Sequence, residues 1–252
     1  MTKPLASLYP AKATKERIIA ALDVASAEKA REIVAELRDA VGAFKIGSQF
    51  FTSAGPSLVR EFTDAGIKIF LDLKFHDIPN TVAKAAVEAA RLGVWMMNVH
   101  TLGGNEMMKR TVDEVQAVCE KEHIAKPHVI GVTILTSSMA ATLYEVGINV
   151  EVEEQVVKLS RLAQQCGLDG VVASPHEIES IRKAVNNPEF LIVTPGIRQA
   201  SATKDDQKRV KTFAQAIASG SDFVVIGRPI LEAKDRSKAV KDIIGEIETT
   251  NK

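Results

Sequence analysis

Residues 67–93 read IKIFLDLKFHDIPNTVAKAAVEAARLG, a strand pattern followed directly by a helix pattern. The apolar run 67–74 has the length and composition of a buried strand. In residues 81–93 the apolar positions recur every three to four residues, as on an amphipathic helix, and Gly93 stands where such a helix would stop. The stretch is therefore a strand–helix unit, and the rest of the chain repeats it.

Eight apolar runs of this kind occur along the chain. The expected strands are 17–24, 42–47, 67–74, 94–100, 128–135, 169–174, 190–197 and 222–228, and the clearest helices between them are 26–40, 81–93, 151–167, 211–220 and 238–248. This alternation, with no Pro/Ser-rich linker, indicates one parallel sheet. Eight units and a first strand without a G-x-G-x-x-G turn favour a single-domain α/β fold, a (β/α)8 TIM barrel, over an open doubly wound sheet. We expect residues 17–252 to form the barrel and residues 1–16 an N-terminal extension that can be disordered.

The composition excludes several classes of protein. Apolar residues make up 46% and charged residues 25% of the chain, and 32 Lys and Arg balance 32 Asp and Glu, which argues against a nucleic-acid or membrane surface. No apolar stretch approaches the roughly 20 residues of a membrane span. Cys119 and Cys166 are isolated cysteines without metal-site spacing, as in buried thiols of a reducing compartment. We expect a soluble cytoplasmic protein with no nucleic-acid or membrane partner.

Polar residues gather at the expected strand ends. In a TIM barrel the catalytic groups lie at the carboxyl ends of the strands, so these residues should share one site. They are Asp23, Lys45, Asp72, Lys74, Asp77, Asn98, His100, Thr136, Ser137, Ser174, His176, Pro195, Gly196, Arg198, Gly227 and Arg228.

Asp72 and Lys74 are two residues apart on one expected strand, so their side chains should point together into the barrel mouth. Lys45, on the neighbouring strand, would flank Asp72 and complete a row of alternating charge. Such a row can be a buried salt bridge that only helps to specify the fold. The row would lie at the functional end of the barrel, next to two Gly- and Arg-containing segments that have the pattern of a phosphate site, and this favours an active site.

The two segments with the pattern of a phosphate site are TPGIR (194–198) and VIGRP (225–229), which follow the last two expected strands. Many barrels bind phosphate there through backbone N–H groups, and Arg198 and Arg228 can add charge-assisted hydrogen bonds. Residues 199–210, QASATKDDQKRV, are polar and long enough to fold over a ligand. Ordinary turns with solvated arginines are the alternative.

The histidines are weaker candidates. His76 and His100 can each be a general acid, although a histidine in such a place is more often a local hydrogen-bonding group. Neither has a partner at zinc-ligand spacing, so we expect no metal site.

The sequence resembles the orotidine 5′-phosphate decarboxylase family. FLDLKFHDIPNTV (70–82) is similar to its D-x-K-x-x-D-I-P-x-T signature, and ALDV, FKIG, NVH, VTILTS, TPGIR and VIGRPI match its other blocks in order, closest to the bacterial branch. The resemblance runs from about residue 17 to 245. It implies decarboxylation of orotidine 5′-phosphate to UMP without a cofactor, the last step of de novo UMP synthesis.

The resemblance also implies roles for single residues. Lys74 would donate a proton to C6 of the pyrimidine, Asp72 would lie against the substrate carboxylate, and Lys45 would complete the charged row and touch the ribose. Asp77, with Ile78 and Thr81, would reach the neighbouring subunit's site in a homodimer. The remaining substrate contacts would be Asp23 to a ribose hydroxyl, Thr136 and Ser137 to the pyrimidine, Pro195 along the pocket, and Gln207, Gly227, Arg198 and Arg228 to the phosphate.

Two other functions stay open. The sugar-phosphate decarboxylases and synthases of the same barrel superfamily resemble this site but hold a magnesium ion with acidic residues. Lys45, where that metal would require a carboxylate, and the I-P-N-T run after Asp77 argue against them. A non-catalytic phosphate-binding protein that has kept the pocket is the other possibility, and the intact set of Asp72, Lys74 and Asp77 argues against it.

Overall fold

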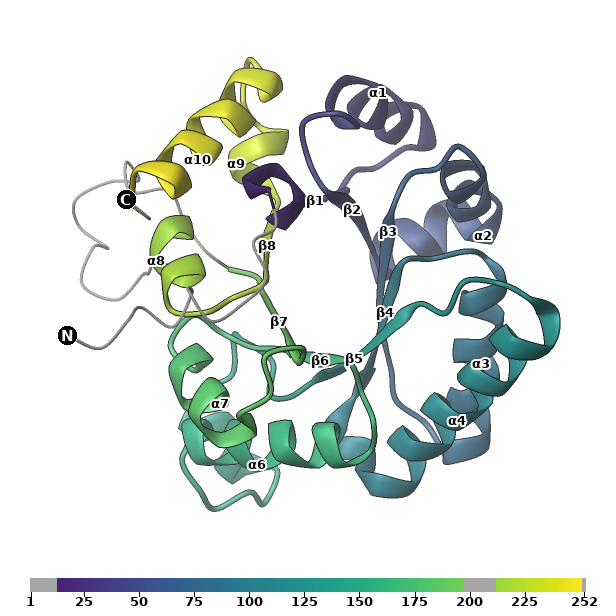
Figure 1. Ribbon diagram of the computed structural model, residues 1–252, viewed down its shortest axis with the longest axis vertical. Coiled ribbons are helices and arrows are strands. Elements are labelled where there is room, and N and C mark those ends of the chain that lie inside the picture. The colour runs from purple at the N-terminus through teal and green to yellow at the C-terminus, as the bar shows by residue number, and fades with distance from the viewer. Residues whose placement is uncertain (1–12, 197–211, 251–252) are drawn as a thin grey trace.

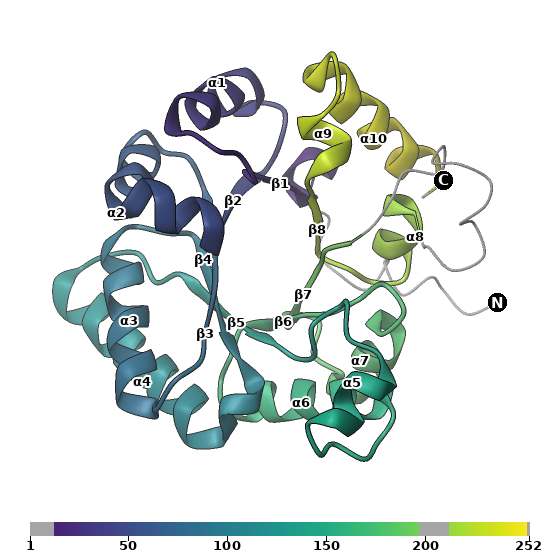
Figure 2. The same cartoon turned by 180° about the vertical axis from the view of Figure 1, so that it is seen from behind.

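The computed structural model describes residues 13–196 and 212–250. Eight parallel strands close into a barrel in chain order, and β8 pairs with β1, so that Ile19 lies opposite both Ala43 and Val225. Figures 1 and 2 show the strands as an inner ring with the helices around it. The predicted (β/α)8 barrel is confirmed, and the open doubly wound sheet is wrong.

All eight expected strands form, with shorter bounds than the apolar runs. They are β1 (Ile18–Ala21), β2 (Ala43–Gly47), β3 (Ile69–Phe75), β4 (Met96–His100), β5 (His128–Val132), β6 (Gly170–Val172), β7 (Leu191–Thr194) and β8 (Phe223–Ile226).

The helices that cover them include the five that the sequence indicates most clearly. They are α1 (Ala27–Leu37), α2 (Ser48–Asp64), α3 (Pro79–Arg91), α4 (Gly104–Glu122), α5 (Ala140–Glu145), α6 (Val152–Gln165), α7 (Ile178–Val185), α8 (Phe213–Ala218), α9 (Arg228–Leu231) and α10 (Arg236–Thr250), with 3-10 turns η2 (Thr14–Arg17) and η3 (Thr101–Gly103).

Local sequence signals account for several helix ends. The Ser26 side chain accepts the N–H of Lys29 at the start of α1, and Thr212 and Gln215 form a capping box at the start of α8. Pro79 opens α3, where its missing N–H is not needed. The predicted stop at Gly93 has φ 75°, a left-handed conformation that glycine adopts without strain.

The strands alternate between two apolar layers. Side chains such as Ile19, Phe70 and Met96 fill the barrel interior, whereas Ile18, Ile69 and Met97 pack outward beneath the helices. Side chains alternate in this way because a strand is pleated with a period of two. Asp72 and Asn98, two residues beyond Phe70 and Met96, therefore also face inward, nearer the carboxyl end of the barrel.

Two further expectations concern the rest of the chain. Cys119 and Cys166 are buried free thiols, as predicted. Among the described residues, the helices are too short or too polar to cross a membrane. Of the expected extension 1–16, residues 14–16 belong to η2, next to Arg17, whose Nη2 donates to the carbonyl of Ser221 over 2.6 Å.

Candidate active site

Asp72 lies between two lysines at the carboxyl end of the barrel. Its Oδ1 is 2.6 Å from Nζ of Lys74, and its Oδ2 is 3.4 Å from Nζ of Lys45. Nζ of Lys45 is also 3.3 Å from Oδ1 of Asp23, two residues beyond the end of β1, so the four side chains form one row of alternating charge. The side chains of Lys45 and Asp72 are 12% and 13% exposed, and such shielding from water strengthens the interactions between them.

The backbone of β3 is irregular at Lys74. Pairing with β4 is regular at Leu71↔Met97 and resumes at Phe75↔Val99, so β3 carries extra residues between these points. Lys74 itself has φ 54°, a conformation that costs a residue with a Cβ roughly 1–2 kcal/mol. Residues held in this way are concentrated at functional sites.

A buried asparagine occupies the irregularity. Asn98 of β4 is fully buried; its Oδ1 accepts the backbone N–H of Lys74 over 2.8 Å, and its Nδ2 donates to Oδ1 of Asp72 over 2.7 Å. The sequence places Asn98 at a strand end but suggests no role for it. Its signal is a lone amide among apolar neighbours at an inward position of VWMMNVH (94–100).

The charged row borders a cavity of about 260 Å³. Lys45, Asp72 and Lys74 line one part of it, and Thr136 and Pro195 line another. The remaining wall is apolar, from Phe70, Val132, Ile134, Leu135, Val172 and Val225. A flat, partly apolar group with a charged substituent would fit between an apolar wall and this charged row.

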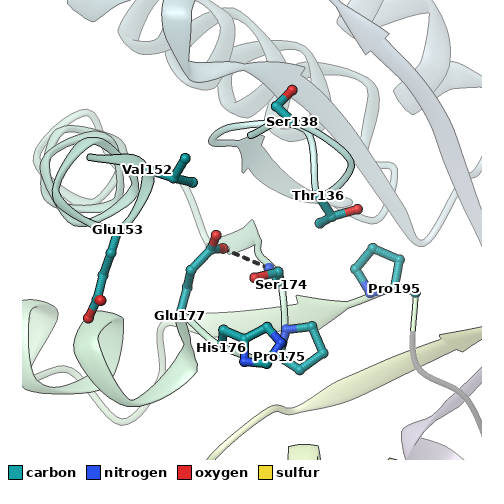
Figure 3. A pocket seen from close by; sticks show the side chains of 10 residues that line it. Thr136, Ser138, Val152, Glu153, Ser174, Pro175, His176, Glu177 and Pro195 are labelled. Atoms are coloured by element: carbon teal, nitrogen blue, oxygen red, sulfur yellow. Dashed lines mark hydrogen bonds between the residues drawn. The ribbon is translucent and has the colours of Figure 1, made fainter. Parts of the chain in front are cut away.

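A second cavity of about 400 Å³ adjoins the first and shares Thr136 and Pro195 with it. Figure 3 shows the loops after β5 and β6 around it, with Glu177 turned toward Ser174. The Glu177 carboxylate accepts the N–H of Ser174 over 2.8 Å. Burial raises the pKa of Glu177 above its ordinary value, and the hydrogen bonds from Ser174 partly oppose this change.

The remaining predicted residues of the mouth lie around these cavities. A Cβ on Gly227 would be 3.7 Å from Oδ2 of Asp23, so the turn after β8 reaches the end of the charged row. Arg228 begins α9 and is exposed. Arg198, Gln207 and the polar segment 199–210 lie outside the described residues.

Asp77, Ile78 and Thr81 form a separate group beyond β3. All three are exposed, Ile78 to 66%, and they line neither cavity of their own chain. Oδ1 of Asp77 accepts the N–H of Ile78 over 2.6 Å at the entry to α3. The structure thus does not bring these residues together with Asp72 and Lys74 around one cavity within a single chain.

The two candidate histidines lie against each other, with ring centroids 5.3 Å apart. Burial, and next the neighbouring His76 and Lys74, lower the pKa of His100 below its ordinary value, which favours the neutral imidazole. Its Nδ1 is buried and has no hydrogen-bond partner among the described residues. A neutral ring of this kind is a poor general acid.

A closed barrel with a charged row at its carboxyl end defines the class as (β/α)8-barrel enzymes. Residues 16–243 match the model of the orotidine 5′-phosphate decarboxylase / HUMPS family. The chain is 52% identical over 233 residues to the orotidine 5′-phosphate decarboxylases of Syntrophotalea carbinolica and Geobacter sulfurreducens. That alignment covers 92% of this chain and 95% and 96% of those two proteins.

The solved structures agree with this match. The crystal structure of orotidine 5′-phosphate decarboxylase from Lactobacillus acidophilus superposes with a TM-score of 0.80 at 37% sequence identity, covering 91% of this chain and 98% of that one. The chain therefore belongs to the orotidine 5′-phosphate decarboxylase / HUMPS family.

Proposed function

We propose that this protein decarboxylates orotidine 5′-phosphate to UMP and carbon dioxide, the last step of de novo UMP synthesis, without a cofactor. The observation that carries the proposal is Asp72, held between Lys45 and Lys74 at the edge of a cavity of about 260 Å³. The protein is also identical at about half of the aligned positions to proteins that are named for this reaction.

The chemistry needs such a row of charges. When the bond from C6 of the pyrimidine to the carboxylate breaks, its electron pair stays on C6 and neutral carbon dioxide leaves. With the substrate carboxylate beside Asp72, their repulsion is lost as carbon dioxide forms, which favours the transition state over the bound substrate. The Lys74 ammonium stabilises the developing negative charge and then donates its proton to C6.

In this proposal, residues at different strand ends bind different parts of the substrate. Asp23 binds a ribose hydroxyl and Lys45 contacts the ribose. Thr136, with Ser137, recognises the pyrimidine, and Pro195 lines the pocket. The phosphate is bound by Gly227, Arg228, Arg198 and Gln207. The closeness of Gly227 to Asp23 supports this arrangement, because ribose and 5′-phosphate are adjacent in the nucleotide. Binding of the phosphate, which is far from C6, would supply binding energy that offsets the repulsion between Asp72 and the substrate carboxylate.

The functional unit in this proposal is a cytoplasmic homodimer, in which Asp77, Ile78 and Thr81 complete the partner's site. Their exposure supports this, since they line neither cavity of their own chain. Ile78 in particular exposes a large apolar side chain that a second subunit would cover.

The test is to add the purified protein to orotidine 5′-phosphate with EDTA present and to follow the loss of the orotate chromophore. The proposal predicts full conversion to UMP at a rate that EDTA leaves unchanged. A rate that collapses with EDTA and returns with Mg²⁺ would favour the sugar-phosphate branch of the family. No conversion, with UMP still bound, would indicate a phosphate-binding protein without catalysis.

A further inference from the structure

Asn98 is buried in a strand whose other side chains are mostly apolar. It is 0% exposed in β4, and burying an amide is costly unless both of its ends are hydrogen-bonded. Both ends are bonded here, and both bonds go to the charged row: Oδ1 accepts from the backbone of Lys74 and Nδ2 donates to the carboxylate of Asp72.

The first bond replaces part of the sheet. Between Leu71 and Phe75 the ladder from β3 to β4 is shifted, and Lys74 has left-handed backbone geometry there. In a regular parallel pair a backbone carbonyl would accept such an N–H group. The side chain of Asn98 accepts it instead, and so holds the backbone that directs the Lys74 ammonium.

The second bond fixes the orientation of the carboxylate. Oδ1 of Asp72 receives Nδ2 of Asn98 at 2.7 Å and Nζ of Lys74 at 2.6 Å. Oδ2 is left on the side of Lys45, 3.4 Å away. Without Asn98, the carboxylate can rotate toward either ammonium.

We propose that Asn98 is a positioning residue for the decarboxylation: one amide fixes the backbone of the proton donor and the carboxylate of its partner in a single relative orientation. This inference rests on the proposed function, since it gives Lys74 and Asp72 the roles stated there. A shift of about 1 Å in groups of this kind can lower a rate on the order of a hundredfold.

The experiment compares Asn98→Ala and Asn98→Asp with Ser221→Ala. Ser221, just ahead of β8, is also fully buried, and its hydroxyl lies 2.9 Å from the carbonyl of Phe223 and 3.3 Å from that of Ile192, so it controls for the loss of a buried hydrogen bond elsewhere. Each variant is tested for kcat on orotidine 5′-phosphate, Kd for UMP and Tm.

We expect Asn98→Ala to lower kcat by about tenfold to a hundredfold while Kd for UMP changes little, because product binding does not need the proton donor aligned. Asn98→Asp keeps the shape and the acceptor for Lys74 but sets a second carboxylate against Asp72, so kcat should be at least as low. Ser221→Ala should lower Tm and leave kcat per folded molecule unchanged.

A kcat of Asn98→Asp within twofold of wild type would overturn the proposal. The proposal would also fail if Ser221→Ala, with the same Tm as Asn98→Ala, lost as much kcat as Asn98→Ala does. If the wild type itself does not convert orotidine 5′-phosphate, the proposed function fails instead. The crystal structure of Asn98→Ala, which removes both hydrogen bonds, then decides the positioning role: retention of the left-handed Lys74 backbone and of its contact with Asp72 would overturn it.

Discussion

The ammonium of Lys74 lies 2.6 Å from the Asp72 carboxylate even though the backbone of Lys74 leaves the regular strand conformation. Simple alternation along β3 puts both side chains on the inner face of the barrel. The left-handed backbone of Lys74 and the hydrogen bond from its N–H to Oδ1 of Asn98 then determine how they meet. The pair is therefore held by the fold before any substrate arrives, as electrostatic catalysis requires.

Replacing Asp72 by Asn removes the charge at the centre of the row and keeps its shape. We expect kcat on orotidine 5′-phosphate to fall by about a hundredfold or more, since removal of one preorganised group typically has this effect. KM should not rise in proportion, because the lost repulsion acts on the bound substrate. Steady-state kinetics separate the two parameters.

The control for Asp72→Asn is Asp242→Asn, which removes a carboxylate from an exposed pair with Lys238 on α10. Such surface pairs contribute about 0–1 kcal/mol, and this one lies on α10, a helix outside the barrel, away from the charged row. Wild-type kinetics are expected for it. Equal kinetics for Asp72→Asn and Asp242→Asn would show that the charge of Asp72 is not used.

Mixing two inactive variants tests whether Asp77 serves the partner subunit. Asp77→Ala and Lys74→Ala should each be nearly inactive alone. After exchange of subunits, about a quarter of wild-type turnover should return, because half of randomly formed dimers are hybrids and each hybrid has one complete site. Recovery is measured after mixing tagged subunits, with hybrid formation followed by co-purification. Proven exchange without recovery would place Asp77 in the site of its own chain.

Glu177 should make stability depend on pH. Its folded pKa is raised above the ordinary value of 4.5, so the folded protein keeps this proton at pH values where the unfolded chain has lost it. The stabilisation is therefore complete below pH 4.5 and is lost as pH rises through the folded pKa. Glu177→Gln stays neutral, so its free energy of unfolding should not show this loss between acidic and neutral pH.

Urea unfolding of wild type and Glu177→Gln between acidic and neutral pH measures this difference. The control is Glu154→Gln, at an exposed position of α6. Its curve should run parallel to that of wild type. If Glu177→Gln also runs parallel, the carboxyl of Glu177 does not keep its proton on folding.

The architecture was accessible from sequence because each barrel unit carries its own signals. Apolar runs such as 67–74 and helix patterns such as 81–93 need only near neighbours to be recognised. The charged row followed from the period of two on β3 and from one adjacent strand. Strand bounds were less accessible: residues 133–135 continue the apolar run of β5, but Ile134 and Leu135 line the cavity beyond the strand end.

The irregularity at Lys74 could not be predicted, because it depends on a residue distant in sequence. Its N–H is accepted by a side chain 24 positions away, and nothing in the letters L-D-L-K-F marks a left-handed residue. The same holds for Asn98, whose role requires knowing which groups of β3 lie opposite it. Exposure of Asp77 and Ile78 likewise becomes visible only when the loop after β3 is placed in space.

The most direct test of the account is Lys74→Ala, examined for turnover of orotidine 5′-phosphate and for binding of UMP on the same preparation. Alanine cannot donate the proton to C6, but the apolar wall of the cavity and the proposed phosphate ligands are unchanged. The account predicts loss of turnover by several orders of magnitude with UMP still bound. Turnover close to wild type in this variant would contradict the central role given to Lys74 and its contact with Asp72.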